Sequence, residues 1–207
     1  MKKRTQTIVW FGVNVDLEYY CHMVDDGVGA NPIFRLRVNE NLQILLSNEQ
    51  PLSAADLNLP PQGDCGSPIS TETSTNLHFH GADVSPICHR DEVVKTIVNA
   101  GETWLFNYSF PVTQPAGLLW WHPHSYPNSL YQIAGGATGV FVIDGIDAVQ
   151  EKVRGIPELI LVFRSEPSRV SSFGDPPSED LSLNFIPILY NNNSYTPPTY
   201  RIKPDEM

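Results

Sequence analysis

The sequence is poor in positive charge, and this shortage excludes one broad class of function. Its 207 residues hold 13 Lys and Arg against 23 Asp and Glu, so the formal net charge is −10. The basic cluster Lys2-Lys3-Arg4 is interpreted as a solvated terminus. Because a protein that binds nucleic-acid phosphates needs a basic surface, the sequence argues against a DNA or RNA partner.

Long apolar runs are also missing. No run reaches the roughly 18–20 apolar residues that a membrane-spanning helix requires, so we expect no membrane span. The first residues are basic and then apolar, which gives them a faint likeness to a signal peptide. The apolar stretch is short, meets Asp16 and Glu18, and lacks a small-residue cleavage site. We therefore predict a first strand there, with Val13, Val15 and Leu17 alternating along it.

Cysteines are few, and their odd number leaves at least one thiol unpaired within the chain. The three are Cys21, Cys65 and Cys88. A bridge between the last two would contribute about 3 kcal/mol in the chain-entropy description. Spacing alone leaves two alternatives open, this disulfide in an oxidising compartment or three free buried thiols.

The distribution of proline and glycine opposes long helices. The 18 prolines and 14 glycines separate short runs of β-branched and aromatic residues. We predict strands within residues 34–47, on both sides of the turn at 99–101, at 140–143, and within 158–163 and 181–190. This pattern indicates an all-β fold, an antiparallel sandwich or barrel.

Four of the six histidines form two closely spaced pairs. His78 and His80 lie in LHFHG, and His122 and His124 lie in WWHPHS. On a strand, residues i and i+2 project from the same face with backbones roughly 6.5–7 Å apart, which suits imidazoles that serve neighbouring metal ions. Because Pro123 lacks a backbone donor, we expect the second pair at an edge or in a strand-like turn. Since imidazole binds copper, zinc, iron and nickel, two such pairs indicate a metal site.

We interpret the other candidate residues near these pairs as structural. His22 and His89 each follow a cysteine, but neither is followed by the His and Met of a blue-copper loop. Asp91 and Glu92 offer acceptors for a ligand imidazole, although a solvated carboxylate pair is the preferred interpretation. We expect the two tryptophans before the second pair to pack into a core and shield the metal, with electron transfer as the alternative.

The histidine pairs occur within a longer series of motifs. LHFHG is followed by the AGE turn, by GLLWWHPH, and by QIAGGATG before a predicted strand. Residues 30–145 thereby resemble the first cupredoxin domain of the multicopper oxidases, the laccase-like family. The resemblance implies a cupredoxin-like Greek-key sandwich or barrel for residues 1–146. It implies a linker and an incomplete second β domain for residues 147–207.

The resemblance also implies a set of copper ligands. In this family a blue copper oxidises the substrate, and four paired histidine motifs hold a three-copper cluster that reduces dioxygen to water. By resemblance, the type 2 copper would be bound by His78, one type 3 copper by His80 and His122, and the other by His124. Zinc is possible in place of copper. The resemblance also favours a Cys65–Cys88 disulfide, because some bacterial members carry a similar bridge.

Parts of the family pattern are absent from these 207 residues. No further histidine pair follows His124, and no His-Cys-His segment offers a blue-copper cysteine. The second pair continues as SYPNSLYQ, where the family has a small turn residue. We therefore expect weak, exchangeable binding of copper or zinc and an inactive chain unless a C-terminal cupredoxin domain or another copy of the chain completes the cluster. By resemblance the protein would be periplasmic or extracellular.

Two other functions remain as alternatives. One is a non-catalytic metal-binding module that oligomerises. The other is a cupin-type enzyme, because that fold also uses a His-x-His motif. A cupin motif continues with a nearby Glu and a later lone His, and the segment GADVSPICHRDE after His80 fits this badly.

Overall fold

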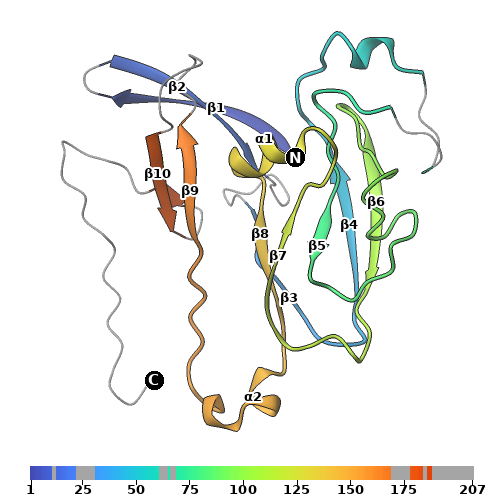
Figure 1. Cartoon of the computed structure of the whole chain (residues 1–207), viewed down its shortest axis with the longest axis vertical. Helices are drawn as coiled ribbons and strands as arrows, with labels where there is room; N and C mark the ends of the chain where they lie inside the picture. The colour runs from blue at the N-terminus through green and yellow to red at the C-terminus, as the bar shows by residue number, and fades with distance from the viewer. Residues whose placement is uncertain are drawn as a thin grey trace. The chain divides into compact units, whose positions relative to one another are not determined.

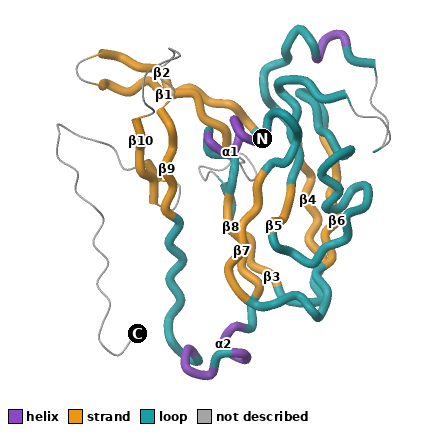
Figure 2. Tube along the Cα trace, in the orientation of Figure 1, coloured by secondary structure: helices purple, strands orange, loops and turns teal. Residues whose placement is uncertain are grey.

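A computed structural model describes residues 1–10, 13–21, 31–60, 65, 69–168, 178–183 and 186–187. The chain divides into two compact units, Met1–Asp144 and Gly145–Met207. Strands are the main element in the described parts of both, and the helices are short (Figure 1, Figure 2). The all-β class predicted from the sequence is therefore confirmed. Among the described residues, no helix combines the length and the apolar character needed to cross a membrane.

The first unit begins with an antiparallel hairpin of β1 and β2, in which Lys2 pairs with Cys21. The sequence predicts β2. It interprets the basic residues Lys2-Lys3-Arg4 as a terminus, whereas the structure places them in β1, which corrects that interpretation. The described elements of this unit are β1 (Lys2–Trp10), β2 (Val13–Cys21), β3 (Phe34–Leu36), β4 (Asn41–Ser47), η1 (Asp56–Asn58), β5 (His78–His80), β6 (Thr103–Ser109), β7 (Gly117–His122), α1 (Ser129–Ala134) and β8 (Gly139–Ile143).

A four-stranded sheet in the order β3-β8-β7-β5 carries the first histidine pair and the start of the second. β3 runs parallel to β8, whereas β7 pairs antiparallel with both β8 and β5 (Figure 1). Gly139 of β8 is needed because a Cβ there would lie 2.3 Å from the ring of Trp121 on β7, closer than packed carbon atoms come. The sheet brings two motifs that lie far apart in the sequence into register.

β4 and β6 form a second antiparallel sheet, and residues from both sheets share one apolar core. Along β6, Phe106 and Tyr108 are buried, while Thr103, Leu105 and Ser109 are exposed. This alternation is what the two-residue period of a strand requires when one face packs on a core. The aromatic part of the core also includes Phe79, Phe110, Trp121 and Phe141.

Burial of the residue between two histidines turns both imidazoles away from the core. Phe79 is fully buried, and its ring centroid lies 4.5 Å from that of Tyr108 and 4.9 Å from that of Phe141. Burying a side chain of this size stabilises the fold by roughly 1.5–3 kcal/mol. Because neighbouring side chains on a strand point to opposite faces, His78 and His80 project together from the other face of the sheet.

One predicted strand in the first unit is wrong. The sequence predicts a strand before the turn at 99–101, but the described residues there make only an isolated bridge between Thr75 and Val98. The Glu92 carboxylate accepts hydrogen bonds from the backbone amides of residues 94–96, at 3.0, 2.7 and 2.6 Å. These amides are therefore not available to a neighbouring strand.

The second unit holds a three-stranded antiparallel sheet in the order β11-β10-β9. Its described elements are α2 (Ile146–Val149), η2 (Glu151–Val153), β9 (Phe163–Ser168), β10 (Ser178–Leu183) and β11 (Ile186–Pro187). The predicted strand at 158–163 is wrong for residues 158–162, which pair with no strand in the described part of the chain. The predicted strand at 181–190 is confirmed where it overlaps β10 and β11. The domain boundary at residue 146 stays a prediction.

Candidate metal centre

The two histidine pairs converge because their strands are hydrogen-bonded neighbours. In the β5–β7 register, His78 lies opposite His122 and His80 lies opposite Trp120. Side chains that oppose each other in an antiparallel pair have Cβ atoms about 4.5–5.5 Å apart, so their rings can meet. The ring centroids of His78 and His122 are 5.1 Å apart, and those of His80 and His122 are 5.4 Å apart.

Three imidazoles offer nitrogen atoms to one shared space. One ring nitrogen from each of His78, His80 and His122 lies within 4.8 Å of the other two. His80 Nδ1 and His122 Nε2 lie 3.2 Å apart. Two nitrogens bound to one tetrahedral ion at 2.0–2.1 Å would be about 3.3 Å apart. The donor atoms and their spacing therefore fit a metal ion.

His124 lies with these rings but outside the set of three close nitrogens. Its ring centroid is 5.3 Å from that of His78 and 5.9 Å from that of His122. β7 ends at His122, and His124 is exposed. Of the four predicted ligands, the structure brings three together and places His124 at the margin.

Hydrogen bonds determine which nitrogen two of the imidazoles present. Asp91 Oδ2 lies 2.8 Å from His78 Nδ1, and Asp91 Oδ1 accepts from the Phe79 amide at 3.0 Å. The Pro123 carbonyl lies 2.9 Å from His122 Nδ1. Each Nδ1 is therefore assigned the proton, and each Nε2 keeps its lone pair for a metal. The preferred interpretation of Asp91 as a solvated carboxylate is wrong, because Asp91 is only 9% exposed.

Burial keeps His122 in the form that binds metals. Burial lowers the pKa of His122 to about 4; the hydrogen bond to the Pro123 carbonyl opposes this shift, and the neighbouring imidazoles add to it. His122 is therefore neutral at pH 7, as a metal ligand must be. Burial, and then the charge of Asp91, raises the pKa of Tyr108 well above its usual value. The Tyr108 hydroxyl donates to the Leu77 carbonyl at 2.9 Å, next to His78.

A half-exposed tryptophan covers two of the imidazoles. The ring of Trp120 stacks on His80 at 4.9 Å and on His122 at 4.1 Å, with 28° between the planes in both cases. Its side chain is 37% exposed, whereas Trp121 is 1% exposed. Core packing, predicted for both tryptophans, is therefore confirmed for Trp121, while Trp120 lies against the histidines.

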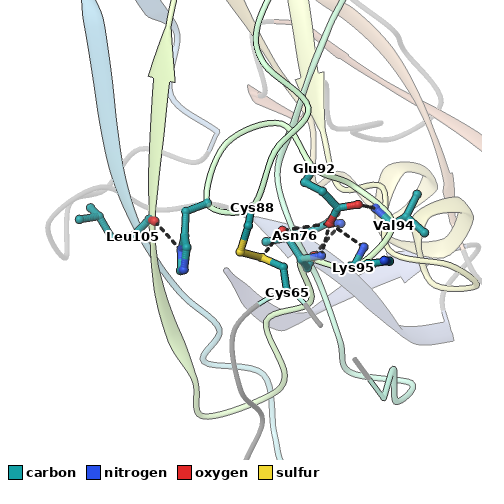
Figure 3. The surroundings of a disulfide bond; sticks show 9 residues. Cys65, Asn76, Cys88, Glu92, Val94, Lys95 and Leu105 are labelled. Atoms are coloured by element: carbon teal, nitrogen blue, oxygen red, sulfur yellow. Dashed lines mark hydrogen bonds between the residues drawn. A yellow bond between two sulfur atoms is a disulfide. The ribbon is translucent and has the colours of Figure 1, made fainter. Parts of the chain in front are cut away.

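A Cys65–Cys88 disulfide is present in the first unit, and Figure 3 shows it beside the hydrogen bonds of Glu92. Its two cysteines and His89 bring three donor atoms together, but sulfurs joined in a disulfide are not free for a metal. The ring of His89 stacks on Trp104 at 5.0 Å, which fits a structural role. Glu92 serves backbone amides and is not a plain solvated carboxylate. His22 lies outside the described residues.

Comparison with known proteins finds a family match for part of the chain. Residues 70–147 match the sequence pattern of the multicopper oxidase family. This segment, 70–147, is therefore similar to a domain of the multicopper oxidases. The matching segment contains both histidine pairs, Asp91 and Trp120. Copper is therefore the metal that the family implies for this site.

The similar proteins are much longer than this chain. The iron transport multicopper oxidase FET3 of Candida albicans is 36% identical over 77 residues, which are 36% of this chain and 11% of that protein. The laccase-like multicopper oxidase CueO of an Ochrobactrum species superimposes with a TM-score of 0.53 at 21% identity. The match covers 89% of this chain and 38% of the CueO chain. McoA of Aquifex aeolicus superimposes with a TM-score of 0.51 at 19% identity, and the match covers 90% of this chain and 38% of the McoA chain. At these identities the two structures support the fold alone.

Proposed function

We propose that this chain is the copper-binding N-terminal portion of a multicopper oxidase, an enzyme that couples substrate oxidation to the reduction of dioxygen to water. The observation that carries the proposal is the approach of three imidazole nitrogens to within 4.8 Å of one another. In this proposal residues 1–146 form the metal-binding cupredoxin-like domain. Residues 147–207 form a linker and part of a second domain.

The four paired histidines divide among the ions in the proposed site. His80 and His122 share one type 3 copper, and their 3.2 Å nitrogen contact supports this pairing. His78 binds the type 2 copper through Nε2, because Asp91 occupies its Nδ1. His124 binds the remaining type 3 copper. Zinc fits the same imidazoles and can replace copper.

The proposed site is a half-site that needs ligands from elsewhere. Four histidines shared among three ions leave each ion short of the four ligands that close a typical tetrahedral site. Only His22 and His89 stand outside the pairs in these 207 residues. We therefore propose that a C-terminal cupredoxin domain, or another copy of the chain, supplies the missing ligands. Alone, the chain binds copper weakly and has no oxidase activity.

An oxidising compartment, periplasmic or extracellular, belongs to the same proposal. Disulfides persist in such compartments and are rare in a reducing cytosol. The Cys65–Cys88 disulfide supports this location.

Copper titration of the purified chain tests the proposal. We expect copper to bind, and His122→Ala and His80→Ala to weaken binding at least tenfold, while the matched control His89→Ala leaves it unchanged. Copper-edge anomalous scattering should place the metal between β5 and β7. An oxygen electrode should record no turnover. The proposal is wrong if copper does not bind, or if the variants bind it as tightly as the parent; strong absorption near 600 nm would contradict the absence of a blue-copper centre.

A second candidate function, a non-catalytic metal-binding module that oligomerises, rests on exposed apolar side chains close to the histidines in sequence. Trp120 is 37% exposed, Tyr126 is 86% exposed and Leu130 is 71% exposed. Apolar groups near a partly exposed metal site suit a protein interface. Sedimentation with and without copper tests this alternative, because it requires self-association; a chain that stays monomeric in both conditions would contradict it.

A further inference from the structure

Strand pairing accounts for the position of His122 but not for that of His124. The β5–β7 ladder pairs His78 with His122, and β7 ends there. The next residue, Pro123, has no backbone N–H and cannot extend the ladder as a donor. Another interaction must therefore hold the backbone of His124.

Continuing the β5–β7 register by two residues places Asn76 opposite His124. At this position a side chain takes the place of the ladder, because the backbone amide of His124 donates to Asn76 Oδ1 at 2.6 Å. Asn76 Nδ2 donates to the carbonyls of Val93 and Thr96, both at 3.1 Å. Asn76 is fully buried, so these three bonds replace the water that its amide group has lost.

The two carbonyls that receive the Asn76 amide belong to a well-anchored segment. Backbone amides of residues 94–96 donate to the Glu92 carboxylate, which Figure 3 shows beside Asn76 and the disulfide. The hydroxyl of Thr96 lies 3.1 Å from Cys65 Sγ. Asn76 therefore connects His124 to a part of the chain whose position is already determined.

The chain after His124 has an anchor of its own. The side chains of Ser125, Asn128 and Gln132 all donate to the Ser74 carbonyl, at 3.0, 3.0 and 2.8 Å. His124 thus lies between two independent attachments, the β5–β7 ladder before it and these three bonds after it. Losing the Asn76 bond should leave both attachments intact and release mainly His124.

We propose that Asn76 is the positioning residue of His124, and that it sets how well this imidazole joins the other three at the metal. The inference rests on the proposed copper-binding function and extends it to a residue that does not touch the metal. Asn76 acts only through His124, so its contribution should vanish when that imidazole is removed. The other imidazoles are held by the ladder and by Asp91 and do not depend on Asn76.

The test compares Asn76→Ala with a matched control, Asn48→Ala. Asn48 is also a buried amide, 1% exposed, and its Nδ2 donates to the carbonyls of Thr73 and Val98 at 2.8 and 2.9 Å. Both variants should lower the urea midpoint similarly, since each removes two buried amide donors. Only N76A should weaken copper binding, by about 10- to 100-fold, the usual effect of losing a group that orients a ligand. In the double variant with H124A, N76A should cause no further loss.

Three outcomes decide the matter. If H78A, H80A and H122A all bind copper like the parent, the proposed function fails whatever Asn76 does. If these variants weaken binding but N76A behaves like N48A, the positioning role is overturned and the function stands. A loss from N76A that persists in the H124A background also overturns it. Should N76A not fold, Asn76→Ser, whose hydroxyl is too short to reach the His124 amide, is expected to show the same copper-specific loss.

Discussion

Replacing Asp91 with asparagine removes one negative charge beside His78 while keeping the side chain's size. The carboxylate lies 2.8 Å from His78 Nδ1 and accepts from the Phe79 amide at 3.0 Å. An asparagine oxygen can still accept from Phe79, so the fold should lose little. With that oxygen on the Phe79 amide, the asparagine NH2 group faces the protonated His78 Nδ1, so two donors meet and His78 loses the acceptor that orients it.

We expect the substitution to weaken metal binding rather than to destabilise the fold. Losing an orienting partner of a ligand histidine typically weakens metal affinity 10- to 100-fold, which is about 1.4–2.7 kcal/mol. Competition with a chromophoric chelator of known copper affinity measures this change directly. Because the charge of Asp91 also raises the pKa of Tyr108, D91N should lower that pKa while burial keeps it above the usual value. Absorbance at alkaline pH therefore reports that the substitution acts locally.

Glu92→Gln is the matched control for this experiment. Its carboxylate adjoins Asp91 in the chain but serves the amides of residues 94–96 rather than an imidazole. We expect E92Q to lower the urea midpoint and leave copper affinity within about twofold of the parent. Equal copper affinity in D91N and the parent would refute the role assigned to Asp91. So would an equal loss in D91N and E92Q, because the effect would then come from the segment and not from the charge.

Three further predictions follow from the same structure. Trp120→Ala should weaken copper binding several-fold with little change in the urea midpoint, because the ring is 37% exposed yet stacks on His80 and His122; Trp120→Phe should restore most of the affinity. Gly139→Ala should destabilise the fold by about 1–3 kcal/mol in urea unfolding, because the new Cβ overlaps the buried Trp121 ring; an unchanged midpoint would contradict the packing. Burial alone would raise the pKa of Asp56, but hydrogen bonds outweigh it and lower that pKa. The stability from Asp56 is therefore present above its unfolded pKa of about 3.9 and is lost as the pH falls below it. Asp56→Asn should therefore make the urea midpoint depend less on pH between about pH 5 and 3.

Local patterns in the sequence predict the parts of this fold that depend on local rules. The two-residue period places His78 and His80 on one face, with Phe79 on the other, and the structure agrees. The missing N–H of Pro123 predicts the second pair at an edge or in a strand-like turn; β7 does end at His122, but His122 itself pairs with His78 inside the sheet, so the prediction holds only for the part after it. Each of these features depends on residues within a few positions of one another.

Long-range pairing is what the sequence alone does not specify. Residues 93–98 form an apolar run before a turn, as a strand would, but the carboxylate of Glu92 withdraws the amides of residues 94–96 from pairing. The neighbours of Asp91 in sequence give no sign that it meets His78. The β5–β7 register joins residues 40 to 44 positions apart, and a shift by one would turn every side chain to the opposite face.

The four histidines are held in place in two different ways, because the β5–β7 pairing stops at His122. Backbone pairing orients His78, His80 and His122 at no cost beyond that of forming the sheet, and these are the three whose nitrogens lie within 4.8 Å of one another. His124 lies past the proline, so its backbone is held by one buried side chain, Asn76, instead of by strand pairing. A site built this way should lose its ligands in a set order as it is loosened, with His124 first. Hydrogen exchange should therefore find the His124 amide opening at a lower free energy than the amides of β5 and β7, and equal protection would contradict this order.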